Sequence, residues 1–221
     1  MSPRPRTVED VEILMATSRA ISREGPARFT LADVGREVGL SPATLLQRFG
    51  SKRGLLLALA ELGVSGVDAC FAAARAEHAS PLAALLSAAT EMTRHMQTPE
   101  ELANGLAFLQ IDMSDPDFHA LALENARRTV DGYRTLIEEA VAAGELRPCD
   151  GGRLARAVNS LAGGSLISWA ILREGTAEDW VRGDLDALLD PYRTDTAKGE
   201  AKAEAEATGR RRGRIGSRRA G

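Results

Sequence analysis

Two short segments joined by a tight turn constrain the fold of this chain most. They cover residues 31–38 and 42–49, with Gly39-Leu40-Ser41 between them. Thr30 and Ser41 stand just before the two segments, where Ser and Thr cap helix N-termini. Pro42 suits a first helical position, and Gly39 suits a helix end. The sequence therefore predicts two short helices with the size and turn of a helix-turn-helix.

The rest of the chain is predicted to be helical as well. Ala and Leu dominate the apolar residues, and no segment alternates apolar and polar residues over the length of a strand. Pro and Gly divide the sequence into helix-sized segments. We expect an all-α protein with further helices over 8–23 (N-cap Thr7), 52–78, 81–97, 100–111, 117–143, 153–173 and 177–192.

Charge is distributed unevenly along the sequence. Residues 1–54 hold nine basic and six acidic side chains, 55–193 hold eleven and 21, and 194–221 hold eight and four. Contacts with nucleic acid are therefore expected only at the two ends. Residues 194–221 lack apolar periodicity and are predicted to be a disordered basic tail. Their arginines are either simply solvated or bind DNA phosphates without sequence specificity.

Several classes of protein do not fit this sequence. Cys70 and Cys149 have no metal-like spacing, and His78, His95 and His119 lack Cys or Asp partners, so no metal and no cofactor are expected. We find no signal peptide and no apolar run long enough for a membrane span, which predicts a cytoplasmic protein. The sequence contains no nucleophile–base pair and no phosphate loop, so an enzyme is not expected. A helical module whose N-terminal part binds protein remains an alternative.

The segment 30–55 resembles the DNA-binding signature of the TetR family. It reads TLADVGREVGLSPATLLQRFGSKRGL, and the match to the family pattern includes the exit Phe49-x-Ser51-Lys52. The resemblance is specific over about residues 8–60 and concerns only the architecture beyond them. It implies three parts: a helix-turn-helix DNA-binding domain over 1–51, a helical ligand-binding and dimerisation domain over 52–193, and the tail over 194–221.

The resemblance assigns DNA contacts by matching position. Phosphate contacts fall to Thr30, Ser41, Thr44 and Lys52, and base reading falls to Pro42, Ala43, Thr44 and Gln47. Thr30 and Ser41 could equally be ordinary helix caps.

The sequence departs from the family pattern at three of these positions. Leu46 stands where the family usually has Tyr, so it is expected to touch sugar or a thymine methyl instead of phosphate. Arg48 replaces a common His and could add a phosphate contact, and Ala43 replaces a frequent Gly. Gln47 and Arg48 could also be merely solvated. These departures affect which operator sequence is bound and do not affect the expectation of DNA binding itself.

The resemblance also implies an effector pocket and a dimer interface in the body. Aromatic, Met and His side chains on the middle helices are the pocket candidates: Phe71, Met92, His95, Met96, Phe108, Met113 and Tyr133. The last two helices would pair with their copies through Leu161, Ser165, Trp169, Trp180, Leu185 and Leu188. For both sets the alternative is ordinary core packing.

The function implied is a ligand-responsive repressor. It would bind a palindromic operator as a homodimer and be released by a small molecule. The helix that begins at Lys52 would couple the two parts, because its tilt sets the spacing of the two DNA-binding units.

Overall fold

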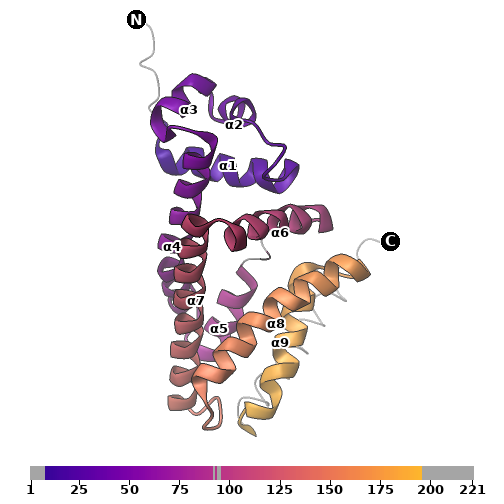
Figure 1. Cartoon of the computed structure of the whole chain (residues 1–221). Coiled ribbons are helices and arrows are strands. Elements are labelled where there is room, and N and C mark those ends of the chain that lie inside the picture. Colours follow the sequence, from indigo (N-terminus) through magenta and orange to yellow (C-terminus); the bar gives the residue numbers. More distant parts are fainter. Residues whose placement is uncertain (1–7, 92, 94–95, 196–221) are drawn as a thin grey trace, which may run out of the picture.

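The computed structural model describes residues 8–91, 93 and 96–195, and all regular secondary structure in this part of the chain is helical (Figure 1). The prediction of an all-α protein is confirmed. The helices are α1 (Asp10–Glu24), α2 (Leu31–Val38), α3 (Pro42–Phe49), α4 (Lys52–Glu77), α5 (Pro81–Glu91), α6 (Pro99–Ser114), α7 (Pro116–Ala142), α8 (Gly151–Leu172), α9 (Ala177–Leu189) and the 3₁₀ turn η2 (Asp190–Tyr192).

Residues 8–54, which we call the head, comprise α1–α3 and the first turn of α4. Their buried side chains come from α1, α2, α3 and the loop before α2, and the largest of them are Ile13, Phe29 and Leu45. The two short helices have the predicted bounds, and Thr30 and Ser41 cap them as predicted. Helix α1 begins at Asp10, after Glu9, and the predicted cap Thr7 lies outside the described residues.

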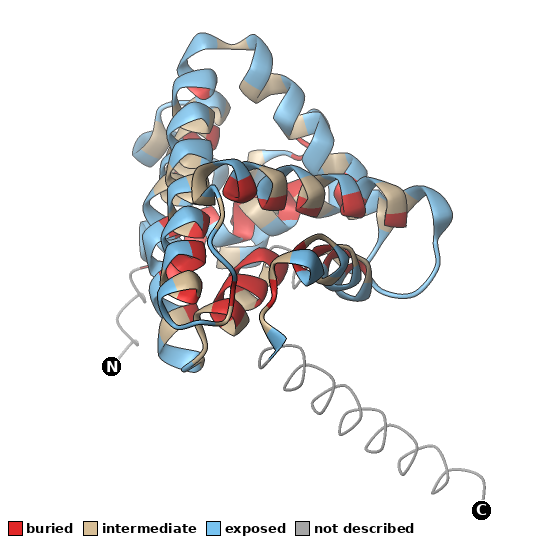
Figure 2. Cartoon of the chain, turned by 90° about the horizontal axis from the view of Figure 1, so that it is seen from below, coloured by how far each residue is buried: buried red, intermediate tan, exposed pale blue. Residues whose placement is uncertain are grey.

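Residues 55–195, which we call the body, pack around α4 and α7, which lie side by side and run in the same direction (Figure 1). Helices α5 and α8 cover this pair, and α9 packs on α8 and α5. The inward faces of these five helices form a second core cluster that includes Phe71, Leu136, Val158 and Leu185 (Figure 2). Helix α6 lies between head and body and contacts α1, α7 and α8. The predicted helix over 81–97 is shorter, because α5 ends at Glu91.

Helix α4 differs from the sequence-based expectation in one respect. Within the described residues it is the one helix long and apolar enough to cross a membrane by length and composition, with 28% of that segment buried. No single apolar run in α4 is long, but the Ala residues spread along the helix raise its mean hydropathy. Its side chains Leu55, Val67 and Phe71 are buried against neighbouring helices, as in a core helix.

Candidate nucleic-acid interface and effector grooves

The turn between α2 and α3 is built by local hydrogen bonds. Asp33 accepts from the Thr30 backbone N–H (2.9 Å), and the Thr30 hydroxyl accepts from the Asp33 N–H (3.3 Å), which makes a complete capping box. The Thr30 hydroxyl also holds the pKa of Asp33 below its usual value. A Cβ on Gly35 would lie 2.4 Å from the Leu40 carbonyl oxygen, so the turn needs a glycine there.

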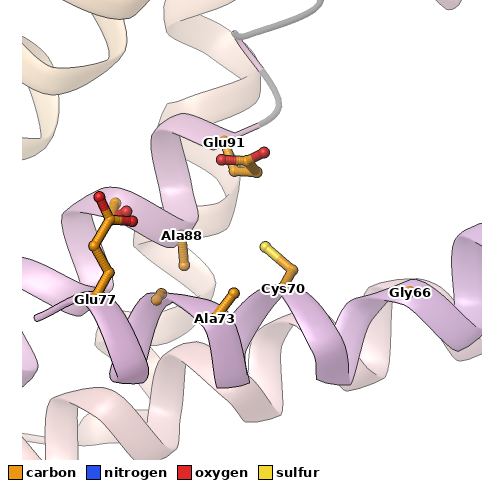
Figure 3. A pocket seen from close by; sticks show the side chains of 8 residues that line it. Gly66, Cys70, Ala73, Glu77, Ala88 and Glu91 are labelled. Atoms are coloured by element: carbon orange, nitrogen blue, oxygen red, sulfur yellow. The ribbon is translucent and has the colours of Figure 1, made fainter.

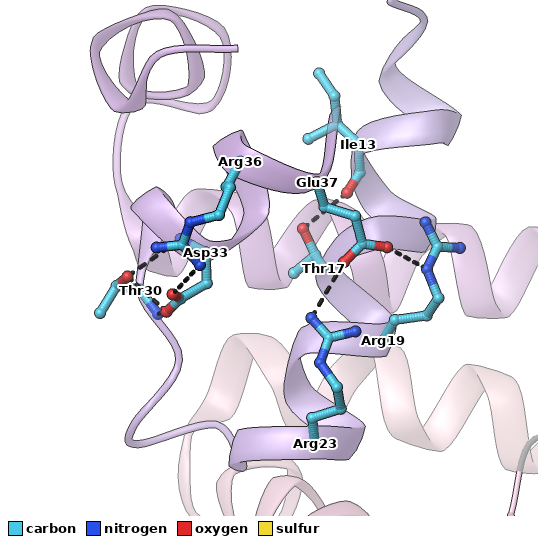
Figure 4. A network of polar contacts seen from close by, with 8 residues as sticks. All are labelled: Ile13, Thr17, Arg19, Arg23, Thr30, Asp33, Arg36 and Glu37. Atoms are coloured by element: carbon cyan, nitrogen blue, oxygen red, sulfur yellow. Dashed lines mark hydrogen bonds and ion pairs between the residues drawn. The ribbon is translucent and has the colours of Figure 1, made fainter. Parts of the chain in front are cut away.

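Ion pairs fix α2 on α1. Glu37 of α2 pairs with Arg19 and with Arg23 of α1, the latter at 3.2 Å (Figure 4). On the same side of the head, Arg36 pairs with Asp33 at 3.2 Å. These cations are therefore paired within the head.

Helix α3 presents its N-terminal half to solvent. Ser41 Oγ accepts from the Thr44 N–H (3.1 Å) and lies 2.9 Å from Thr44 Oγ1. Leu45 is 1% exposed and anchors the helix, whereas Leu46 is 44% exposed. Most of the residues predicted to touch DNA are exposed on this helix or at its cap: Ser41, Pro42, Ala43, Leu46, Gln47 and Arg48. The structure therefore brings the predicted base-reading residues onto one short, accessible helix.

Two side chains predicted to contact phosphate already have hydrogen-bond partners within the chain. Lys52 Nζ donates to the Phe29 carbonyl oxygen (2.7 Å) and lies 4.0 Å from the centre of the Phe29 ring, and burial lowers its pKa. Arg48 Nη1 donates to the Val8 carbonyl oxygen (2.6 Å) and pairs with Asp10 at 3.2 Å. Both side chains tie α3 and α4 to α1 and to the α1–α2 loop.

The Lys52 contacts lead to a stability prediction. Lys52→Met keeps most of the apolar stem but removes the donor and the charge above the Phe29 ring. We expect the free energy of unfolding to fall by about 1.5–3 kcal/mol, the usual range for hydrogen bonds to charged groups. Urea unfolding followed by circular dichroism measures it. Arg28→Met is the control, because Arg28 is exposed and its bond to the Glu24 carbonyl is a surface contact. Equal stability of both variants and the wild type would mean that Lys52 has no structural role.

The predicted effector residues that the structure describes do not gather at one site, although two of them are in contact. Phe71 and Tyr133 are buried in the body core, where their rings meet edge to face at 5.2 Å, and burial raises the pKa of Tyr133. Phe108 packs edge to face on Phe118, and Met96 packs against the body core. Met113 is 66% exposed, and Met92 and His95 lie outside the described residues.

Two grooves open on the body instead. One, of about 250 Å³, lies between α4 and α5 and is lined by Gly66, Cys70, Ala73, Ala74, Glu77, Ser87, Ala88 and Glu91 (Figure 3). The other, of about 370 Å³, lies between α6 and α8 and is mainly apolar, with Leu106 and Ile171 on its walls and Arg173 at its rim. None of the predicted effector residues that the structure describes lines either groove. Large side chains fill the core, and the α4–α5 groove opens where facing helices carry small residues.

The predicted dimer residues divide into two groups. Ser165, Trp169 and Leu185 are buried in the body's own core, so their side chains present no surface to a second copy. Ser165 donates to the Leu161 carbonyl (2.8 Å) or to Asp184 of α9 (2.6 Å), and the Trp169 indole N–H donates to the Gly175 carbonyl (3.3 Å). Leu161, Trp180 and Leu188 are half-buried. The three buried side chains face the body's own core in this chain, and the dimer interface itself stays a prediction.

Sequence reasoning missed the residues that join head and body. Arg53 pairs with Asp115 and Asp117 at the α6–α7 corner, and Asn104 Nδ2 donates to the Ser22 carbonyl (2.8 Å). These partners are far apart in the sequence, so no periodicity reveals them. A hint is the Asp-Pro-Asp run at 115–117, because such a run caps a helix and leaves carboxylates exposed.

The comparisons with known proteins agree with this geometry. Residues 13–59 match the model of bacterial regulatory proteins, tetR family. No curated protein matches the chain.

Solved structures share the fold over most of the chain. A Saccharomonospora viridis regulator in complex with choline is 22% identical, with 82% of this chain and 95% of that chain covered and a TM-score of 0.67. SmeT, the repressor of a Stenotrophomonas maltophilia multidrug efflux pump, is 20% identical (86% and 93% covered, TM-score 0.62). FadR from Bacillus subtilis in complex with stearoyl-CoA is 13% identical (82% and 98%, TM-score 0.59).

Proposed function

We propose that this chain is a TetR-type transcriptional regulator that acts as a ligand-responsive repressor. Residues 13–59 match the tetR family, and the body has the same fold as known regulators. It binds a palindromic operator as a homodimer and is released by a small molecule. The proposed division is a DNA-binding domain over 1–51, an effector and dimerisation domain over 52–193 and the tail beyond. The proposed location is the cytoplasm, where operator DNA is found.

The observation that carries the proposal is the exposed N-terminal half of α3. Leu45 holds the helix on the head core, and the adjoining side chains Pro42, Ala43 and Gln47 are left facing solvent. A helix of this size fits the major groove with its first residues against base edges. A Gln side chain can pair with adenine, and Ala or a Thr methyl can meet the methyl of thymine.

Dimerisation is proposed through the exposed apolar face of α8. Ile167, Ile171 and Leu172 are 43%, 74% and 55% exposed. Large apolar side chains gathered on one surface mark an interaction site, and a second copy of the same helix offers a matching face. The half-buried Leu161, Trp180 and Leu188 would extend this interface onto α9. Two heads held by one dimer could then meet successive major grooves.

An effector is proposed to bind in the body. The α4–α5 groove is the better placed of the two, because α4 continues from it to the head. Its Glu77 and Glu91 carboxylates and small side chains suit a compact cationic molecule, and a related structure holds choline. The apolar α6–α8 groove suits a longer aliphatic ligand, and another related structure holds stearoyl-CoA. The effector acts through its difference in affinity between two tilts of α4.

The DNA-binding role is tested with the full chain and fluorescent duplexes. Thr44→Ala combined with Gln47→Ala removes two predicted base contacts. We expect binding to the cognate duplex, taken from DNA flanking its own gene, to weaken by about 10-fold or more, since each good base contact contributes about 1–3 kcal/mol. Binding to a scrambled duplex should change little. Fluorescence anisotropy titrations at fixed salt measure both affinities.

The matched control carries the same substitutions on the body surface. Thr135 and Gln110 are exposed on α7 and α6, so Thr135→Ala with Gln110→Ala should leave both affinities unchanged. If the wild type binds flanking and scrambled DNA equally, with the same salt dependence, the proposed operator recognition is wrong for that DNA. If it prefers the flanking duplex and the α3 variant keeps that preference, α3 does not read the bases.

A further inference from the structure

All the basic side chains in the described part of the head are already engaged. Arg19 and Arg23 pair with Glu37, Arg28 donates to the Glu24 carbonyl, Arg36 pairs with Asp33, and Arg48 and Lys52 bind backbone carbonyls. Six of these seven cations find their partners within residues 8–54. The seventh, Arg53, has its ion-pair partners in the body.

Arg53 is held by two carboxylates at the α6–α7 corner. Its Nη2 donates at 2.9 and 3.0 Å to the two oxygens of Asp115 and at 2.7 Å to Asp117. Hydrogen bonding from Arg53 holds the pKa of Asp115 below its usual value. Carboxylate and phosphate oxygens compete for the same donors of a guanidinium group. The corner therefore gives Arg53 the kind of partner that a DNA backbone would give it.

The position of Arg53 in the chain favours a DNA contact. It follows Lys52 in the first turn of α4, directly after the Ser51 cap and the end of α3. Its side chain is 47% exposed, so its ion pairs are open to solvent and to competing anions. A long Arg side chain at this junction can turn from the body toward a duplex on α3.

The corner itself is attached to the head. Phe118, three residues beyond the α7 cap Asp115, is 1% exposed and belongs to the head's core cluster, and Arg53 lies 5.5 Å from its ring centre. Asn104 of α6 also binds the α1 backbone at Ser22. These attachments keep Asp115 and Asp117 beside the head, within reach of Arg53.

We infer that Arg53 is a phosphate-binding residue of this regulator and that Asp115 and Asp117 compete with the DNA backbone for it. When the corner holds Arg53, the head lacks one phosphate contact; when the corner releases it, that contact forms. The regulatory role of this competition rests on the proposed function, DNA binding by the head. The contact itself applies to any duplex, because phosphate carries no sequence information.

The test uses the salt dependence of binding. Asp115→Asn combined with Asp117→Asn frees Arg53, and Asn at 115 still caps α7. We expect this variant to bind a scrambled duplex more tightly than the wild type at low salt. The slope of log K against log[salt] should become steeper by about 0.9, the value for one added phosphate contact. Anisotropy titrations across a salt series give the slope.

Two further variants separate this inference from a general charge effect. In an Arg53→Gln background, the two Asn substitutions should no longer steepen the slope. Asp131→Asn with Glu138→Gln removes the same charge from exposed positions farther along α7 and should leave the slope near the wild-type value. Thermal unfolding of every variant confirms that it is folded.

The outcomes are distinct from those that test the operator. An unchanged slope in the folded Asp115→Asn/Asp117→Asn variant would overturn the inference even if the operator is recognised. The inference would also be overturned if this variant and Arg53→Gln lost DNA affinity equally, because the ion pair would then be only structural. A steeper slope that needs Arg53, on scrambled DNA, supports the inference even where no flanking operator is found.

Discussion

Leu45→Ala is expected to unfold or severely loosen the head and to abolish operator binding. Leu45 is 1% exposed and belongs to the cluster that holds α3 on α1 and α4. Truncating a buried Leu to Ala costs about 2–5 kcal/mol, because it removes transfer free energy and leaves a cavity. The head is small, so this loss is a large part of what holds it together. Thermal unfolding and anisotropy on the same preparation measure stability and DNA affinity.

Leu46→Ala is the matched control, one residue along the same helix. Leu46 is 44% exposed, so its truncation should change stability by less than about 0.5 kcal/mol. Its effect should be confined to DNA affinity, since the side chain lies on the face predicted to meet the operator. If Leu45→Ala kept both wild-type stability and wild-type binding, the packing of α3 described above would be incorrect.

Trp169→Ala is expected to destabilise the body, the second large effect of a single substitution. The Trp169 side chain is 4% exposed, packs in the body core and donates from its indole N–H to the Gly175 carbonyl in the α8–α9 turn. We expect the free energy of unfolding to fall by about 3–5 kcal/mol, the usual cost of removing a buried aromatic ring. Urea unfolding at two protein concentrations measures this loss. Because the ring belongs to the core, the loss should be the same at both concentrations.

Ile171→Asp tests the proposed interface two residues further along α8. Ile171 is 74% exposed, so a charge there should cost the single chain little but should weaken association of two copies. The unfolding midpoint of a dimer rises with protein concentration, and this dependence should be reduced in the Ile171→Asp variant. Sedimentation velocity gives the association state directly. The opposite pattern, with Trp169→Ala dissociating a stable dimer and Ile171→Asp silent, would restore Trp169 as an interface residue.

The sequence determined the helices of the head almost to the residue. The bounds of α2 and α3 and their Thr30 and Ser41 caps depend on contacts within three or four residues. Such contacts are written in the local sequence, as is the preference of Pro42 for a first helical turn. The same local chemistry made the family resemblance visible in this segment, and residues 13–59 match the family model.

Only the tertiary structure decided what the charged side chains do. The partners of Lys52, Arg48 and Arg53 lie 23, 40 and 62 residues away from them in the chain. From the sequence, a cation beside a helix-turn-helix is predicted to bind phosphate. The carbonyl or carboxylate that pairs with it in the folded chain is distant in the sequence and so cannot be recognised. The ion pair of Arg53 could be found only after α6 and α7 had been placed beside α4.

The same limit applies to the apolar residues of the body. Helical periodicity shows that Trp169, Ile171 and Leu185 belong to amphipathic helices, but it does not show which neighbour each face will meet. The structure buries Trp169 and Leu185 and leaves Ile171 exposed. It also opens the α4–α5 groove where Ala73 and Ala88 leave space. The sequence determined helices and caps because those depend on near neighbours; burial, ion pairs and cavities depend on residues that meet only when the chain is folded.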